Sequence, residues 1–130
     1  MGGIVASLLI WILEGAASIL CMNDMQPALA AHGLSMEMNA GMLLISVIAS
    51  LITGLALIFF YAAVRPRFGP GPRTAVSVAL ALWLSDYLLS LLAYQMIGLF
   101  HGRMLTMWDA VGLIEMILPA LAGGWIYREA

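Results

Sequence analysis

The stretch Arg65-Pro66-Arg67-Phe68-Gly69-Pro70-Gly71-Pro72-Arg73 decides how this chain folds. It is the place where charged residues and helix-breaking residues coincide between two long apolar runs. Proline removes a backbone N–H donor and glycine permits tight turns, so the chain is predicted to reverse its direction here. Its arginines favour the cytoplasmic side of a membrane, because short cytoplasmic loops are enriched in Lys and Arg.

The composition on either side of this stretch is that of a membrane protein. Hydrophobic residues make up 64% of the chain and charged residues only 9%, against roughly 45–50% and 25% in soluble domains. The apolar runs are continuous rather than alternating, which excludes a β-barrel. We therefore predict an all-α integral membrane four-helix bundle, a single transmembrane domain over residues 1–130. Its expected spans are about 4–22, 40–64, 74–99 and 107–127.

The arginines divide unequally between the two ends of the predicted bundle. One end holds Arg65, Arg67, Arg73 and Arg128, and the other end holds Arg103. This asymmetry predicts that both termini are cytoplasmic, an N-in/C-in topology, with the loops at 23–39 and 100–105 outside.

Two local patterns concern helix contacts and helix ends. Ser46, Ser50 and Gly54 place small side chains at every fourth position of the second span. This spacing lines one helix face and allows a neighbouring helix to approach closely, although ordinary packing explains it as well. Thr106, followed three residues later by Asp109, resembles a capping box and predicts that Thr106 is the N-cap of the fourth span.

Two stretches carry a resemblance to known sequences. They are Tyr-Ala-Ala-Val-Arg-Pro-Arg-Phe-Gly-Pro-Gly-Pro at 61–72 and Gly-Trp-Ile-Tyr-Arg-Glu at 124–129. With them the chain resembles an uncharacterised family of small four-span bacterial membrane proteins. The resemblance implies a bacterial inner (cytoplasmic) membrane and no catalytic activity.

Three carboxylates, Glu14, Asp86 and Glu115, fall near the middle of predicted spans. Inserting an acid at a helix centre costs on the order of 2.5–3.5 kcal/mol, so each acid should face the bundle interior or a wet cavity. Helical spacing places Ser18 beside Glu14 and Ser90 beside Asp86, which together define an intramembrane polar site. Because no Lys, Arg or His lies at that depth, we expect neutral acids that donate hydrogen bonds to neighbouring helices.

Three interpretations of these acids stay open. In the first, they form interhelical hydrogen bonds that fix the helix register, typically worth about 0.6 kcal/mol each in membranes. In the second, they form a path for protons or cations. In the third, they face a cation or an electron-transfer partner outside this chain. Amide substitution separates the first two, since an amide keeps a hydrogen bond but cannot release a proton.

Sulfur-containing side chains are concentrated toward the predicted outer end. Thioether, thiolate and imidazole ligands together suit Cu(I), although methionine is also a common filler of apolar interiors. No cofactor other than this copper alternative is indicated. The candidate copper ligands are Cys21, His32, Met36, Met38, His101, Met104 and Met107.

The sequence contains no Ser-His-Asp or His-Glu-x-x-His motif, no glycine-rich phosphate loop and no basic patch. We therefore expect that the protein is not an enzyme and does not bind nucleic acid.

The predicted function is a structural or accessory subunit that lies in the lipid bilayer and packs against other membrane subunits or copies of itself. One alternative is a small proton- or cation-coupled transporter that uses the three acids. At this size a transporter implies a homodimer or larger assembly. Another alternative is Cu(I) binding at the outer face.

Overall fold

The computed structural model describes residues 1–127, which form helices joined by short connections and contain no strand. The predicted all-α four-helix bundle is confirmed. Arg128 and the end of the 124–129 motif lie outside the described residues. The helices are α1 (Gly2–Ala30), α2 (Ala40–Phe68), α3 (Pro72–Leu82), the π-helix η1 (Trp83–Leu88), α4 (Leu89–Met96) and α5 (Gly102–Ile126).

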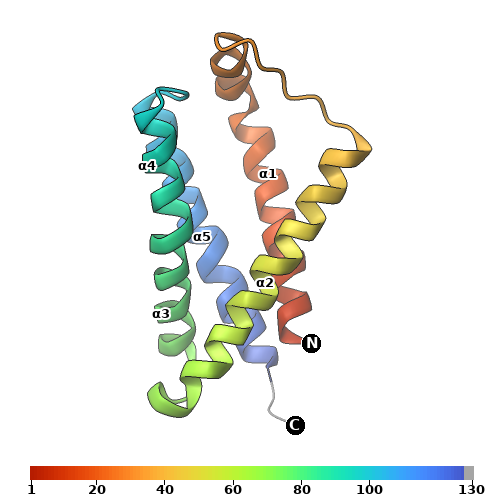
Figure 1. Ribbon diagram of the computed structural model, residues 1–130. Coiled ribbons are helices and arrows are strands. Elements are labelled where there is room, and N and C mark those ends of the chain that lie inside the picture. Colours follow the sequence, from red (N-terminus) through yellow and green to blue (C-terminus); the bar gives the residue numbers. More distant parts are fainter. Residues whose placement is uncertain (128–130) are drawn as a thin grey trace.

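Four helical segments in the described part of the chain are long and apolar enough to cross a membrane. Three of them are α1, α2 and α5, and the other is the continuous rod Pro72–Met96 formed by α3, η1 and α4 (Figure 1). Their 25–29 residues correspond to roughly 38–44 Å at 1.5 Å per residue, more than the ~30 Å hydrocarbon core. The chain is therefore a multi-pass membrane protein.

The first two helices run further than their apolar residues suggest. α1 continues beyond residue 22 to Ala30 and includes Pro27 in its last turn, and α2 continues through Pro66 to Phe68. Backbone hydrogen bonding within a helix does not depend on whether its side chains are apolar, so a helix can extend past its hydrophobic stretch. The reversal is confined to 69–71, where Gly69 (φ 82°) and Gly71 (φ 131°) adopt conformations that favour glycine.

The fourth span begins earlier than predicted, and the proposed capping box is wrong. α5 starts at Gly102 with His101 at its N-cap position. Thr106 lies inside the helix, where its hydroxyl donates a hydrogen bond to the Gly102 carbonyl oxygen at 2.8 Å. This local bond to the backbone four residues earlier is a common alternative to capping for a threonine.

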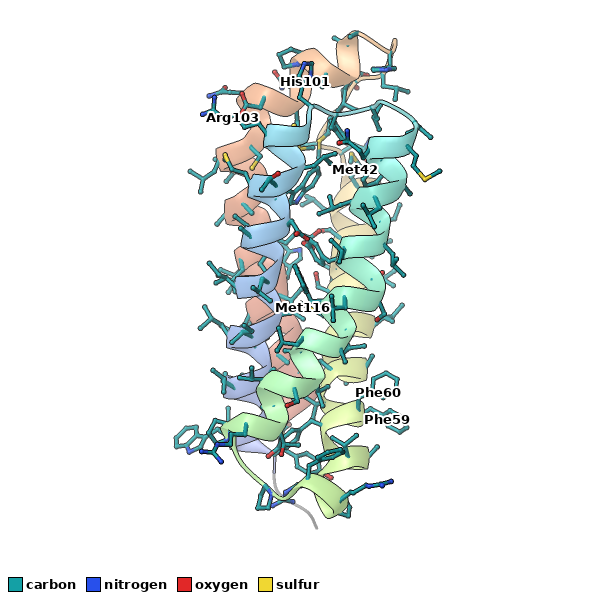
Figure 2. The ribbon with its side chains drawn as sticks, turned by 90° about the vertical axis from the view of Figure 1, so that its left-hand side faces the viewer. Met42, Phe59, Phe60, His101, Arg103 and Met116 are labelled. Atoms are coloured by element: carbon teal, nitrogen blue, oxygen red, sulfur yellow. The ribbon has the colours of Figure 1, made fainter. Side chains whose placement is uncertain are left out.

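The two ends of the bundle differ in their connections. The beginning of α1, the α2–α3 turn and the end of α5 lie at one end (Figure 1), which we call the arginine end because Arg65, Arg67 and Arg73 flank that turn. The connections 31–39 and 97–101 lie at the opposite end, where Figure 2 shows His101 and Arg103.

All four spans contribute to the core at the arginine end. α1, α2, α3 and α5 supply its buried apolar side chains, and several of these are alanines that allow close packing. This arginine-end core consists of Ala6, Ile10, Leu57, Ile58, Tyr61, Ala75, Val78, Ala79, Met116 and Ala120.

α2 is missing from the core at the opposite end. α1, α4, α5 and the 97–101 turn supply this second core, which consists of Cys21, Met25, Leu91, Phe100, Met104 and Leu105. Within the described chain, α2 contacts α1, α3 and α5 but neither η1 nor α4. Figure 1 shows α2 crossing the bundle diagonally, so that its Ala40 end lies far from α4.

α1 and α2 cross closely at Gly54. A Cβ atom on Gly54 would collide with the backbone and hydroxyl of Ser7 on α1. The Ser7 hydroxyl donates to the Gly3 carbonyl oxygen at 2.8 Å and also lies 3.2 Å from the Leu51 carbonyl oxygen of α2. The small-residue pattern of the second span thus does mark a close helix contact at Gly54.

A carboxylate cavity at mid-depth as candidate functional site

A cavity of about 200 Å³ lies where α2 separates from the rod formed by α3, η1 and α4. Four helical elements line it, namely α1, α2, η1 and α5, and all three predicted intramembrane acids are among the lining residues. Ile10, Ala49 and Met116 form its apolar wall. Its polar lining residues are Glu14, Ser50, Thr53, Asp86, Tyr87 and Glu115.

The cavity lies near the middle of the spans. Glu14, Asp86 and Glu115 are each close to the midpoint of Gly2–Ala30, Pro72–Met96 and Gly102–Ile126, respectively. Met116, in the cavity wall, lies near mid-height of the bundle in Figure 2, below His101 and above Phe59. The polar groups therefore occupy the depth at which charge is least compatible with lipid.

Glu115 is the most deeply buried acid of the cavity, with only 3% of its surface exposed. The Tyr87 hydroxyl donates a hydrogen bond of 2.7 Å to Glu115 Oε2. Glu115 Oε1 is buried without a hydrogen-bond partner, and so is the Oγ of Ser50 across the cavity. Since buried polar groups are nearly always paired, two unpaired oxygens in one cavity indicate space for a polar or charged ligand.

Gly112 and the π-helix bring Tyr87 to Glu115. A Cβ atom on Gly112 would collide with the Tyr87 ring, so the absence of a side chain lets the ring lie against α5. Tyr87 and Asp86 both lie in η1, and both line the cavity. A π-helix rotates successive side chains differently from an α-helix, and such segments occur frequently at functional sites.

Glu14 and Asp86 differ from Glu115 because both are exposed in this chain. They line the cavity on α1 and η1, while Thr53 on α2 is half-buried. The three acids thus differ in their exposure, with Glu14 and Asp86 at the open side of the cavity and Glu115 at its closed inner end. This arrangement combines an accessible entrance with a buried carboxyl group held by a phenol.

The predicted serines are not part of this cavity. Ser18 is half-buried and Ser90 is exposed, and neither lines it. Sequence reasoning missed Ser50, Thr53 and Tyr87 as site residues. Ser50 belonged to the small-residue pattern of the second span, which was a usable signal. The sequence contains no such signal for Tyr87, because α-helical periodicity does not place Tyr87 on the same face as Asp86.

The candidate copper ligands are only partly brought together. Cys21 and Met104 are buried in the opposite-end core, and Met36 packs against that core. Met38 and Met107 are 68% and 45% exposed, and both histidines are exposed. The Nδ1 of His32 lies 2.9 Å from the Ala28 carbonyl oxygen, and His101 is at the start of α5.

Among residues 1–127, no three His, Cys, Asp or Glu side chains form a group suited to a metal ion. The three cavity acids are therefore spread around a space rather than gathered at one point. The polar residues of the cavity surround one common space, whereas the candidate copper ligands are only partly brought together, so the cavity is the better candidate for a binding site.

Comparison with models of known families, with curated proteins and with solved structures gives no match to this chain. Its fold and site define a four-span helical membrane protein with an acidic cavity at mid-depth.

Proposed function

We propose that the protein binds a cation in the carboxylate cavity in exchange for protons, as a small proton- or cation-coupled membrane transporter. The observation that carries this proposal is the convergence of Glu14, Asp86 and Glu115 on one mid-depth cavity that also contains unpaired buried oxygens. Three ionised acids in one low-dielectric space repel one another, so protons or a bound cation must compensate their charge. Competition between the two for the same oxygens couples cation binding to proton release.

The proposal does not involve catalysis. A transport role requires only that the acids alternate between proton-bound and cation-bound forms, and the graded exposure of the three acids supports this alternation.

Proteoliposomes with an internal pH-sensitive dye provide the test. Imposed gradients of sodium, potassium or tetramethylammonium should drive proton movement through the wild-type protein for at least one of these ions. Glu115→Gln should reduce that movement at least tenfold, because the amide keeps a hydrogen bond to Tyr87 but cannot release a proton. Ser90→Ala is the matched control, since Ser90 is exposed and does not line the cavity. Normal proton coupling in Glu115→Gln, or none in the wild type, contradicts the proposal.

A second candidate function is that of an accessory subunit. The exposed Glu14 and Asp86 at the open side of the cavity favour it, because a helix from another subunit could pair a Lys or Arg with them. Native mass spectrometry of protein extracted gently from its membrane separates the two functions. A defined complex with a different subunit supports the accessory function, and a homo-oligomer alone supports transport.

We further propose that the protein lies in a bacterial inner membrane with both termini in the cytoplasm, as the arginine asymmetry indicates. Phe68, at the arginine end, is 70% exposed, and His101 lies in an exposed position at the opposite end. A membrane-impermeant maleimide added to intact cells should label His101→Cys but not Phe68→Cys. The reverse labelling pattern would reverse the topology.

A further inference from the structure

The carboxylate cavity opens sideways, between α2 and the rod formed by α3, η1 and α4. α2 contacts neither η1 nor α4, although Ala49, Ser50 and Thr53 of α2 line the cavity together with Asp86 and Tyr87 of η1. Ala49 and Asp86 are exposed even though they line it. The opening is therefore in the side of the bundle at mid-depth, on the side where Figure 1 shows α2 diverging from α4.

Exposed apolar side chains lie beside the two exposed lining residues. Ile52 is three residues after Ala49 on α2 and Leu89 is three residues after Asp86 on the rod, so each shares a helix face with its lining residue. They are 63% and 59% exposed. Exposed aliphatic side chains at mid-depth of a membrane span face acyl chains. A ligand that passes this side meets hydrocarbon first and carboxylates second.

We infer that the ligand is a small organic ammonium ion carrying hydrocarbon groups, which enters the cavity from the side between α2 and η1. This inference rests on the proposed function. A hydrated metal ion is excluded from hydrocarbon by its solvation, whereas an ammonium with apolar substituents has chemistry that matches both the lipid-facing entrance and the acids. Ile10, Ala49, Met116 and the Tyr87 ring provide an apolar surface beside those acids, and an aromatic ring attracts a cation placed over its face.

The volume of the cavity limits the size of the ligand. An apolar protein cavity of about 150 Å³ holds benzene, so a cavity of about 200 Å³ that is open on one side accommodates a small ammonium ion with one benzene-sized substituent. Sites for drug-sized ligands usually range from roughly 300 to 1,000 Å³. The cavity should therefore reject large quaternary ions.

Calorimetric titration of the full chain in detergent micelles tests the inference with defined probes. Benzyltrimethylammonium is the main probe because, as a quaternary ion, it has no neutral form. Potassium tests metal binding and tetrabutylammonium tests size, and released protons are measured in the same titrations. We expect saturable binding of benzyltrimethylammonium with proton release, and binding of the other two ions at least tenfold weaker.

Two variants locate the binding. Glu115→Gln should abolish the proton release. Ala49→Leu should weaken the binding of benzyltrimethylammonium at least tenfold, because the larger side chain fills the entrance while all three acids remain. Val47→Leu is the control, because Val47 is exposed on the same helix and does not line the cavity.

The outcomes separate this inference from the proposed function. If potassium binds as tightly as benzyltrimethylammonium, the inferred organic ligand is wrong. If Ala49→Leu binds benzyltrimethylammonium as tightly as the wild type does, the inferred side entrance is wrong. Either result leaves the proposed cation site in place. Failure of every probe to bind, together with the absence of proton release, overturns both.

Discussion

The arginine-end core and the opposite-end core differ both in the size of their side chains and in their packing. Four spans meet at the arginine end, where Gly54 lies against Ser7 and Ala75, Ala79 and Ala120 are buried. Three spans meet at the opposite end, around larger side chains such as Met25 and Phe100. Without water between helices, association depends on close van der Waals contact, which small side chains permit.

The cavity lies at the transition between these two regions. Ile10 and Met116 belong to the arginine-end core and also line the cavity. Beyond this level α2 no longer contacts the neighbouring rod. A change in side-chain size along the bundle axis therefore creates a mid-depth space, and the acids line that space.

Leucine truncation in the two cores should have the largest effect on stability. Leu57 is 0% exposed and Leu91 is 7% exposed. Leu→Ala in a tightly packed site typically costs 2–5 kcal/mol, depending on how far the site can relax. We expect about 3 kcal/mol for Leu57→Ala and about 2 kcal/mol for Leu91→Ala, measured by denaturant unfolding in micelles. A larger cost for Leu91→Ala would contradict the difference between the two cores.

Adding a methyl group at the α1–α2 crossing should have the next largest effect. In Gly54→Ala the new Cβ meets the Ser7 backbone, which cannot move cheaply. Overpacking of this kind typically costs 1–3 kcal/mol, so we expect about 2 kcal/mol and a lower midpoint of thermal unfolding. Gly15→Ala is the control because nothing lies near its Cβ position, and it should be neutral or stabilising. Equal effects of the two variants would show that α1 and α2 do not depend on this crossing.

Gly112→Ala should disturb the site more than the fold. Its Cβ collides with the Tyr87 ring, so the hydrogen bond from Tyr87 to Glu115 should be lost, at a cost of about 1 kcal/mol for an unpaired buried group. Proton-coupled flux should fall at least as far as in Tyr87→Phe. Gly124→Ala, on the same helix, places its Cβ at ordinary contact distances of 3.5–3.6 Å and should leave flux unchanged. If Gly112→Ala keeps full flux, the Tyr87–Glu115 contact is not part of the mechanism.

Part of the site could be predicted from the sequence. The cost of an acid in lipid identifies Glu14, Asp86 and Glu115 as interior or cavity residues, and the cavity contains all three. Tyr87 could not be found in this way, because the π-helix changes the direction of its side chain relative to an α-helical register. Ser18 and Ser90 were expected beside the acids on helical spacing, yet neither lines the cavity.

The sequence by itself determined the membrane class, the number of spans, a chain reversal within 65–73 and the depth of the acids. These properties depend on hydrophobicity, proline, glycine and residue counting, which act locally along the chain. Only the tertiary structure decided that α2 leaves the bundle at mid-depth, that the acids share one cavity and that Glu115 is buried while Glu14 is exposed. Those properties depend on which helix faces pack together, and in lipid that choice is made by contacts between distant residues such as Gly54 and Ser7.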